Sequence, residues 1–231
     1  MSKRIAIIPA RGGSKRIPKK NIKEFCGKPI IAYAIEEALK SGIFDEVMVS
    51  TDSDEIADIA KRYGANVPFL RSEETAGDFA TTADVIFEVL DKYEELGTHF
   101  EYGICVYPTA PFVTAEKIKQ AMDVVESEDC NIVLPVVVFS YPPQRGYVLK
   151  DERLGMKYPE NFKARSQDLE RMYHDAGQFF AINVERYRQH SGIIIDGIAP
   201  MIMDEREVQD IDNETDWEIA EIKYKLMLKK D

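Results

Sequence analysis

The sequence predicts an α/β fold with a mostly parallel central sheet and helices on both of its faces. Short apolar segments of β-rich composition alternate with longer segments of helical periodicity along most of the chain. No internal repeat, low-complexity stretch or Gly/Ser-rich linker interrupts this alternation. At 231 residues, 45% of them hydrophobic, the chain is long enough for one packed core. Because parallel strands need a crossover helix, we expect a single three-layer, Rossmann-like domain over residues 1–231.

The expected elements follow one another in order along the chain. The expected strands are Lys3–Ile8, Glu46–Thr51, Val67–Leu70, Tyr102–Tyr107, Asn131–Phe139 and Gln178–Val184. The expected helices are Pro29–Ser41, Ser53–Tyr63, Thr81–Leu96, Thr114–Glu126 and Thr215–Leu228. Gly42 and Gly64 stand where the first two helices should end, because glycine readily adopts the conformation of a helix C-terminus. The last helix has four apolar residues expected to cover the core, Trp217, Ile219, Ile222 and Leu226.

The regular alternation fails between about Ser140 and Asp175. This stretch is rich in Pro, Arg, Tyr and acidic residues, and Gly146–Leu149 is a short strand candidate within it. We interpret residues of about 140–175 as an insertion into the domain that forms a dimerisation arm.

Composition excludes several classes of protein. The net charge of −11 argues against general nucleic-acid binding, which needs an excess of Lys and Arg. No apolar run is long enough for a membrane span, and the N-terminal residues do not resemble a signal peptide. The three cysteines are far apart and odd in number, which favours buried thiols in a reducing compartment. We therefore expect a cytoplasmic protein that binds neither nucleic acid nor membrane.

The clearest functional signal is the segment Pro9–Asn21, directly after the first expected strand. Gly12 and Gly13 free the backbone for turns in which consecutive N–H groups can point at an anion. Six basic residues lie between positions 11 and 23, namely Arg11, Lys15, Arg16, Lys19, Lys20 and Lys23. On a chain of net negative charge, such a cluster suits a small polyanion. A solvated basic turn is the alternative, but the position at the end of a strand favours phosphate binding. The segment is neither a Walker A loop nor a dinucleotide fingerprint.

A second signal is the pair Asp210 and Asp212, separated by one residue. In an extended segment this spacing puts both carboxylates on the same side of the backbone. Mg²⁺ prefers carboxylate, water and phosphate oxygens, so the pair suits that ion. Acidic residues also favour helix N-termini, and we assign Glu214 and Asp216 to that role. The spacing alone leaves both roles open for Asp210 and Asp212.

Together these segments resemble the bacterial sugar-acid cytidylyltransferases, which include the synthetases of CMP-sialic acid. Residues 10–21 resemble the family signature A-R-x-G-S-K-x-x-x-x-K-N. Four more motifs follow in family order, VSTD at Val49–Asp52, the segment Arg71–Asp78, PTAP at Pro108–Pro111 and DID at Asp210–Asp212. The resemblance covers nearly the whole chain. It implies a nucleotidyltransferase sheet and a homodimer in which the arm contacts the partner's pocket.

The resemblance also implies a set of CTP-binding residues. The implied contacts to the triphosphate and ribose are Ala10, Arg11, Gly12, Gly13, Ser14, Lys15, Lys20 and Asn21. Arg11 and Lys20 are implied to be the catalytic charge partners of the phosphates, and Asp210 and Asp212 to be catalytic Mg²⁺ ligands.

The segment Arg71–Asp78 resembles the family pattern R-P-x-E-L-A-x-D, with Ser72 in place of Pro and Thr75 in place of Leu. The resemblance implies that Arg71 recognises cytosine and that Ala80 and Thr82 lie against the base and ribose. An ion pair on the surface is the alternative for Arg71.

The acceptor side departs from the sialic acid enzymes. Tyr107 stands where those enzymes carry Gln, and the segments RSQDL and YHDAGQF at 165–169 and 173–179 look like the pseudaminic acid branch. The implied acceptor-binding residues are Tyr107, Arg165, Gln167, His174, Gln178 and Phe179. An ion pair within the insertion is an equal alternative for Arg165, and a structural role is the alternative for His174.

The expected reaction is Mg²⁺-dependent transfer of CMP from CTP to the anomeric hydroxyl of a nonulosonic acid, with release of pyrophosphate. Pseudaminic acid is the expected acceptor, and N-acetylneuraminic, legionaminic or 3-deoxy-octulosonic acid are the alternatives. A non-catalytic nucleotide-binding regulatory domain is the alternative from another class. Nothing in the sequence compels a covalent enzyme intermediate.

Overall fold

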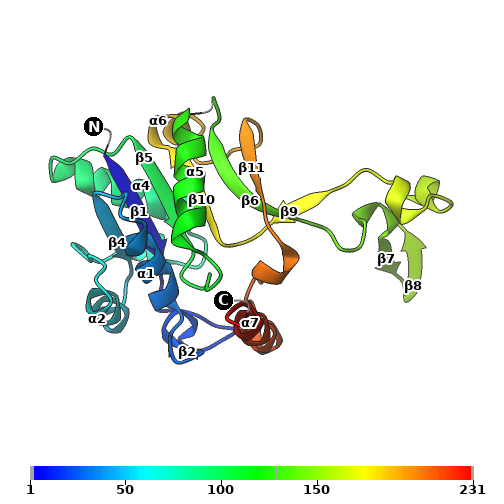
Figure 1. Cartoon of the computed structure of the whole chain (residues 1–231), viewed down its shortest axis with the longest axis horizontal. Coiled ribbons are helices and arrows are strands. Elements are labelled where there is room, and N and C mark those ends of the chain that lie inside the picture. Colours follow the sequence, from blue (N-terminus) through cyan, green and yellow to red (C-terminus); the bar gives the residue numbers. More distant parts are fainter. Residues whose placement is uncertain (1–2, 128, 230–231) are drawn as a thin grey trace.

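The computed structural model describes residues 3–127 and 129–229 of the chain. Within them, a seven-stranded sheet runs in the order β11-β6-β10-β5-β1-β4, with β9 paired to the end of β6 (Figure 1). Its strands are β1 (Arg4–Pro9), β4 (Glu46–Ser50), β5 (Tyr102–Val106), β6 (Ile132–Val138), β9 (Tyr173–Asp175), β10 (Phe179–Asn183) and β11 (Ile198–Ile202). The α-helices are α1 (Ile31–Ser41), α2 (Asp54–Arg62), α3 (Glu73–Ala76), α4 (Thr82–Glu95), α5 (Ala115–Ser127), α6 (Val184–Gln189) and α7 (Glu214–Met227).

The sheet is mostly parallel. β1 pairs in parallel with β4 and β5, and β11 pairs in parallel with β6. Strand β10 lies antiparallel between β5 and β6, and the short β9 also runs antiparallel to β6. The predicted α/β class with a mostly parallel Rossmann-like sheet is therefore confirmed.

Alternating residues of the strands supply the two faces of the core. In β1, Ala6 and Ile8 pack toward the layer of α1, α2 and α5, whereas Ile5 and Ile7 pack toward α4 and α6. All four side chains are almost completely buried. A parallel strand covered on both faces must be apolar at every position, which explains the continuous apolar run of the sequence.

A third apolar cluster lies beside the sheet and holds α7. The hairpin of β2 (Glu24–Phe25) and β3 (Lys28–Pro29) places Phe25 edge-on to Tyr33 and Trp217, with ring centroids 5.6 and 5.5 Å apart. Only Trp217 and Ala220 of α7 are buried. The prediction that this helix covers the main core was wrong for its other three apolar residues, because Ile219, Ile222 and Leu226 are 40%, 60% and 56% exposed.

The segment Val67–Leu70 was expected to be a strand and is not one. Only an isolated bridge between Met48 and Asn66 continues the sheet beyond β4. Pro68 has no N–H to donate, which accounts for the early end of the pairing.

The irregular stretch after β6 forms an arm that extends away from the sheet (Figure 1). Its hairpin consists of β7 (Tyr147–Lys150) and β8 (Arg153–Met156), which pair only with each other. Three short 3-10 turns also lie on the arm, at Pro143–Arg145, Pro159–Asn161 and Ser166–Asp168. Two more occur elsewhere in the described chain, at Lys20–Ile22 and Glu205–Glu207. The arm spans the expected insertion, and its strand β7 lies where a short strand was expected.

Candidate active site

The loop that follows β1 is fixed at both of its ends. The backbone N–H of Gly12 donates to Oδ1 of Asp52 at 2.7 Å, and Nδ2 of Asn21 donates to the carbonyl oxygen of Arg11 at 2.9 Å. A Cβ atom at Gly12 would lie 3.2 Å from the Cβ of Ser53, so a side chain would crowd the neighbouring segment. Asp52 lies just beyond the carboxyl end of β4, which ends at Ser50. The two neighbouring strands therefore hold the loop at their carboxyl ends.

Three charged side chains meet at the mouth of this loop. Lys15 Nζ lies 2.5 Å from Oδ2 of Asp78, and Arg11 donates to Oδ1 of Asp78 at 3.2 Å. All three side chains are partly or largely exposed. The hydrogen bond and charge of Lys15, followed by those of Arg11, hold the pKa of Asp78 below its ordinary value. Two cations thus converge on one carboxylate, at a position where an anionic ligand could replace it.

Arg71 is buried at the opposite side of the same space. Its guanidinium donates to the hydroxyl and the carbonyl oxygen of Ser50, at 3.1 and 2.7 Å. Burial lowers the pKa of Arg71, while the carboxylates of Asp52 and Glu88 act in the other direction. Hence Arg71 is a fixed donor group rather than a mobile surface cation, and within the described part of the chain it forms none of the surface ion pairs that were its alternative.

Glu88 of α4 holds the segment that carries Arg71. One carboxylate oxygen accepts from the backbone N–H of Ser72 at 2.8 Å, and Lys92 donates to the same oxygen at 2.6 Å. Thr75 donates to the other oxygen. Burial opposes ionisation of Glu88, but the hydrogen bonds from Lys92, Thr75 and Ser72 outweigh it and lower its pKa.

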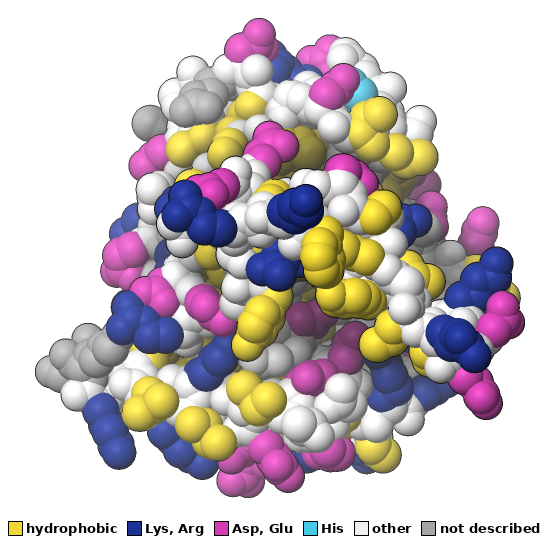
Figure 2. Space-filling model, turned by 90° about the vertical axis from the view of Figure 1, so that its right-hand side faces the viewer, with side chains coloured by type: hydrophobic (Ala, Val, Ile, Leu, Met, Phe, Trp, Pro, Cys, Tyr) yellow, Lys and Arg dark blue, Asp and Glu magenta, His cyan; other side chains and the backbone are white. Residues whose placement is uncertain are grey.

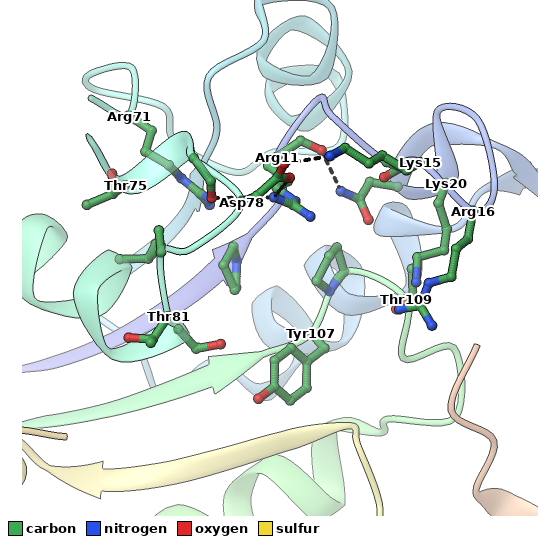
Figure 3. A pocket seen from close by; sticks show the side chains of 18 of the residues that line it. Arg11, Lys15, Arg16, Lys20, Arg71, Thr75, Asp78, Thr81, Tyr107 and Thr109 are labelled. Atoms are coloured by element: carbon green, nitrogen blue, oxygen red, sulfur yellow. Dashed lines mark hydrogen bonds and ion pairs between the residues drawn. The ribbon is translucent and has the colours of Figure 1, made fainter. Parts of the chain in front are cut away.

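These elements surround a cleft of about 510 Å³ (Figure 3). In Figure 3, Arg71 and Thr75 lie on one side, Lys20 and Arg16 on the other, and Tyr107 lies below. The predicted site residues that line the cleft are Arg11, Ser14, Lys15, Lys20, Asn21, Arg71, Ala80, Thr82 and Tyr107. The fold therefore brings the phosphate-loop residues and the predicted base-binding residues to one cavity.

Lys20 connects the loop to the segment of the two aspartates, 191 residues away. Its Nζ donates to the carbonyl oxygen of Ile211 at 2.6 Å. Arg16 of the same loop pairs with Asp212 at 2.8 Å. Burial lowers the pKa of Lys20, and the carboxylates of Asp212 and Asp210 oppose that effect. The carboxylate pair thus lies beside the phosphate loop rather than elsewhere on the molecule.

The two aspartates also act on each other. Desolvation by the surrounding chain and the neighbouring Asp212 carboxylate raise the pKa of Asp210. Asp216 has a different role, because its carboxylate accepts from the backbone N–H groups of Asp212 and Asn213 and completes the cap of α7. Two neighbouring carboxylates beside a basic loop suit a hard cation such as Mg²⁺. No group of three or more His, Cys, Asp or Glu side chains within the described residues has metal-binding geometry.

Other predicted residues lie outside the walls of the cleft. Gln167 lies on the arm, where Arg165 pairs with Asp168 at 2.8 Å, the ion pair within the insertion that the sequence left open. His174 of β9 contacts Phe139 and the carbonyl oxygen of Asp175.

The remaining predicted residues support the cleft or surround it. Phe179 and Ala10 are completely buried in the core, and the buried Gln178 donates to the carbonyl oxygen of Glu207. Gly12 lies close to Ser53, whereas a Cβ at Gly13 would meet open space.

Sequence reasoning did not assign several residues of this site. Asp52, which binds the Gly12 amide, belongs to the VSTD motif, and Asp78 ends the Arg71 motif, so both had a signal. Glu88 and Lys92 have the helical spacing of an ion pair, but that spacing does not indicate an anchor for Arg71.

Within the described residues, none of the helices is both long and apolar enough to cross a membrane.

Comparison with known proteins agrees with this geometry. A family profile described as cytidylyltransferase matches residues 5–187. A pseudaminic acid cytidylyltransferase of Campylobacter jejuni is 38% identical over 225 residues, covering 97% of each chain. A CMP-N,N'-diacetyllegionaminic acid synthase of Legionella pneumophila is 33% identical, covering 94% of each chain. The solved structure of a CMP:2-keto-3-deoxy-manno-octonic acid synthetase complexed with CTP has the same fold, with a TM-score of 0.71, 17% identity and full coverage of both chains. This chain belongs to the cytidylyltransferase family and is a nucleotidyltransferase.

Proposed function

We propose that the chain transfers CMP from CTP to the anomeric hydroxyl of pseudaminic acid and releases pyrophosphate. The observation that carries the proposal is the contact between Lys20 and the Ile211 carbonyl, which joins a phosphate-type loop to a pair of carboxylates. The loop alone, or the carboxylate pair alone, would suit many ligands. A basic loop that lines the cleft and a carboxylate pair directly beside that loop suit a nucleoside triphosphate bound with a divalent cation.

The triphosphate would lie along the loop after β1. Arg11 and Lys15 converge on Asp78, and a phosphate group could take the place of that carboxylate. The fixed guanidinium of Arg71 would face the cytosine, whose O2 and N3 atoms accept hydrogen bonds. Ala80 and Thr82, which line the same cleft, would contact the base and ribose.

Asp210 and Asp212 would hold Mg²⁺. The residues fit this ion, because the segment that carries them is joined to the basic loop through Lys20 and Arg16 and because Mg²⁺ is commonly bound by one or two carboxylates together with substrate phosphates and water. When bound, the ion supplies charge neutralisation for the phosphates and the departing pyrophosphate.

The chain's own contribution to the reaction would be alignment and charge. The anomeric oxygen of the acceptor forms a bond to the α-phosphorus of CTP, and the bond from that phosphorus to the oxygen of the β-phosphate breaks. The hydroxyl proton passes to solvent or to a nearby carboxylate. Arg11 and Lys20 would stabilise the negative charge that develops on the phosphate oxygens, which is the largest effect available without a covalent intermediate.

The choice of acceptor rests on the relatives and on Tyr107. The similarity to the pseudaminic acid cytidylyltransferases of Campylobacter jejuni extends over nearly the full chain. Tyr107 lines the cleft, and its phenol is hydrogen-bonded to Thr82. An acceptor with acylamino groups and a different ring stereochemistry needs a different set of contacts from sialic acid. Legionaminic acid and N-acetylneuraminic acid are the competing acceptors.

We further propose a homodimer formed through the arm, and activity in the cytoplasm, where CTP is available. The side of the molecule from which the arm extends exposes hydrophobic side chains among Lys and Arg (Figure 2). The large exposed apolar residues of the arm include Tyr141, Tyr147, Leu149, Leu154 and Phe162. Exposed apolar groups on a projecting hairpin favour burial against a second copy.

Pyrophosphate release with purified chain, CTP and Mg²⁺ tests the proposal against a panel of nonulosonic acids. We expect rapid release with pseudaminic acid and slower release with N,N'-diacetyllegionaminic and N-acetylneuraminic acids. Absence of release with every acceptor, together with tight CTP binding, would instead support a regulatory nucleotide-binding domain. Preference for N-acetylneuraminic acid would exclude the proposed acceptor.

A further inference from the structure

The pairing of β9 and β10 with β6 is interrupted opposite Pro135. The four residues Val133–Val136 of β6 lie opposite the seven residues Asp175–Ala181 and pair with both ends of that stretch. Three extra residues therefore form a bulge. In an antiparallel ladder the N–H and C=O of one residue bond to the same partner strand, and Pro135 offers only its C=O, which accepts from the Ala176 N–H at 2.9 Å. The missing donor explains why regular pairing stops there.

The bulge brings Gly177 against the segment between β11 and α7, which passes beside it (Figure 1). Gly177 has a φ of 65°, in the left-handed region that favours glycine, and its N–H donates to Oδ1 of Asp175 at 2.8 Å. A Cβ atom on Gly177 would lie 3.5 Å from Cγ of Asp210 and 3.7 Å from its Oδ1. The Asp210 carboxyl group therefore lies directly against the backbone of the bulge.

Gln178, the next residue of the bulge, holds the same segment three residues before Asp210. Its side chain is 1% exposed, and its Nε2 donates to the carbonyl oxygen of Glu207. On the other side of Asp210, the carbonyl oxygen of Ile211 accepts from Lys20 at 2.6 Å. The backbone before and after Asp210 is thus fixed by side chains that come from other elements of the fold.

On the basis of the proposed function, we propose that Gly177 and Gln178 are positioning residues for the proposed metal ligand Asp210. Gly177 supports the carboxyl group by direct contact, and Gln178 fixes the backbone that leads to it. Neither residue belongs to the wall of the nucleotide cleft, so both act through Asp210. Bulges are common next to active sites, where they redirect a side chain, and this one directs a carboxylate that belongs to a separate segment.

Substitution of either residue should displace the carboxylate. A residue with a side chain disfavours the φ of Gly177, so the bulge would relax and the surface in contact with Asp210 would move. Gln178→Met keeps the length of the side chain but removes the donor to Glu207. Loss of a group that orients a metal ligand lowers metal affinity about 10- to 100-fold.

The test measures the dissociation constant for CTP by isothermal titration, once with EDTA and once with saturating Mn²⁺. No acceptor is present, so the result does not depend on the transfer reaction. In the wild-type protein Mn²⁺ should tighten CTP binding, because the ion would link the carboxylates to the phosphates. In Gly177→Ala and Gln178→Met this tightening should be about tenfold smaller, while the constant with EDTA stays the same.

Two matched controls lie at the end of α1, which precedes β4 and is at the opposite end of the strands from the cleft. Gly42 also has a φ of 65°, but a Cβ atom there would meet nothing within 4 Å, so Gly42→Ala reproduces only the backbone strain. Ser41→Ala removes a buried donor to the carbonyl oxygen of Ala38, 2.6 Å away. Both controls should lower the melting temperature and leave the tightening by Mn²⁺ as it is in the wild type.

A tightening by Mn²⁺ equal to that of its control would overturn the assignment of either residue. Weaker CTP binding with EDTA would also overturn it, because the bulge would then support the whole cleft. If Gly177→Ala does not fold, Gly177→Asn takes its place, since asparagine adopts this φ more readily. A wild-type protein that binds CTP equally well with EDTA and with Mn²⁺ would instead contradict the metal site of the proposed function.

Discussion

The carboxylate of Asp78 lies 2.5 Å from Nζ of Lys15, and its other oxygen lies 3.2 Å from the Arg11 guanidinium. One acidic side chain thus neutralises the two cations at the mouth of the phosphate loop. A triphosphate must compete with Asp78 for both cations before it can bind in the way we propose.

Asp78→Asn should therefore tighten the binding of CTP. The variant removes the competing charge while keeping the shape of the side chain, and the ion pairs involved are exposed and individually weak. We expect the dissociation constant for CTP to fall about two- to fivefold, with a steeper dependence on salt. Isothermal titration without acceptor measures both. Weaker binding would show that Asp78 supports the loop instead of competing with the ligand.

Lys20→Met should lower turnover far more than the same change at its neighbour. Lys20 contacts the Ile211 carbonyl within the cleft, whereas Lys19 pairs with Glu55 outside it. Loss of a cation that stabilises developing phosphate charge costs about a hundredfold or more in kcat. Lys19→Met serves as the control and should remain within about twofold of the wild type. Equal effects of the two changes would contradict the catalytic role of Lys20.

Asp212→Asn should lower turnover strongly, but to a measurable level, without unfolding the protein. The change keeps the size of the side chain and removes one of the two carboxylates proposed to hold Mg²⁺. The Mg²⁺ concentration for half-maximal activity should rise, and the melting temperature should change little. Glu214→Gln is the control, because Glu214 lies two residues away and pairs with Lys23. An unchanged Mg²⁺ dependence would remove Asp212 from the metal site.

Glu88→Gln should weaken both stability and CTP binding. Glu88 fixes the segment that carries Arg71, and one hydrogen bond to a charged group contributes about 1.5–3 kcal/mol. The pKa of Glu88 lies below its ordinary value of 4.5, so its stabilisation is complete above that pH and is lost as the pH falls through the native value. The difference in unfolding free energy between the two proteins should shrink below about pH 4.5. A constant difference in urea titrations across this range would contradict the assignment.

Local patterns made most strands and helices of the first half and the basic loop after the first strand predictable. The loop is contiguous in the sequence, and its glycines and basic residues stand directly after an apolar strand. Contacts between residues that are distant in the sequence were not predictable in the same way. Nothing in the sequence around Lys20 indicates that its ammonium group meets the carbonyl of Ile211, 191 residues later. That contact depends on how α7 packs beside the β2–β3 hairpin.

The errors in the prediction have physical causes. The apolar residues Ile219, Ile222 and Leu226 suggested a core-facing side of α7, but Trp217 and Tyr224 determine its orientation through aromatic contacts with Phe25. Hydrophobic periodicity does not reveal which of two apolar sides finds a partner.

The most direct test of the account uses CTP labelled at its α-phosphorus. With Mg²⁺ and pseudaminic acid, we predict that the label moves into a product with the mass of the CMP conjugate, and that unlabelled pyrophosphate appears in equal amount. Omission of the acceptor should leave the label in CTP. Label that stays in CTP in the presence of every nonulosonic acid, or that appears as free CMP without an acceptor, would contradict the proposed transfer.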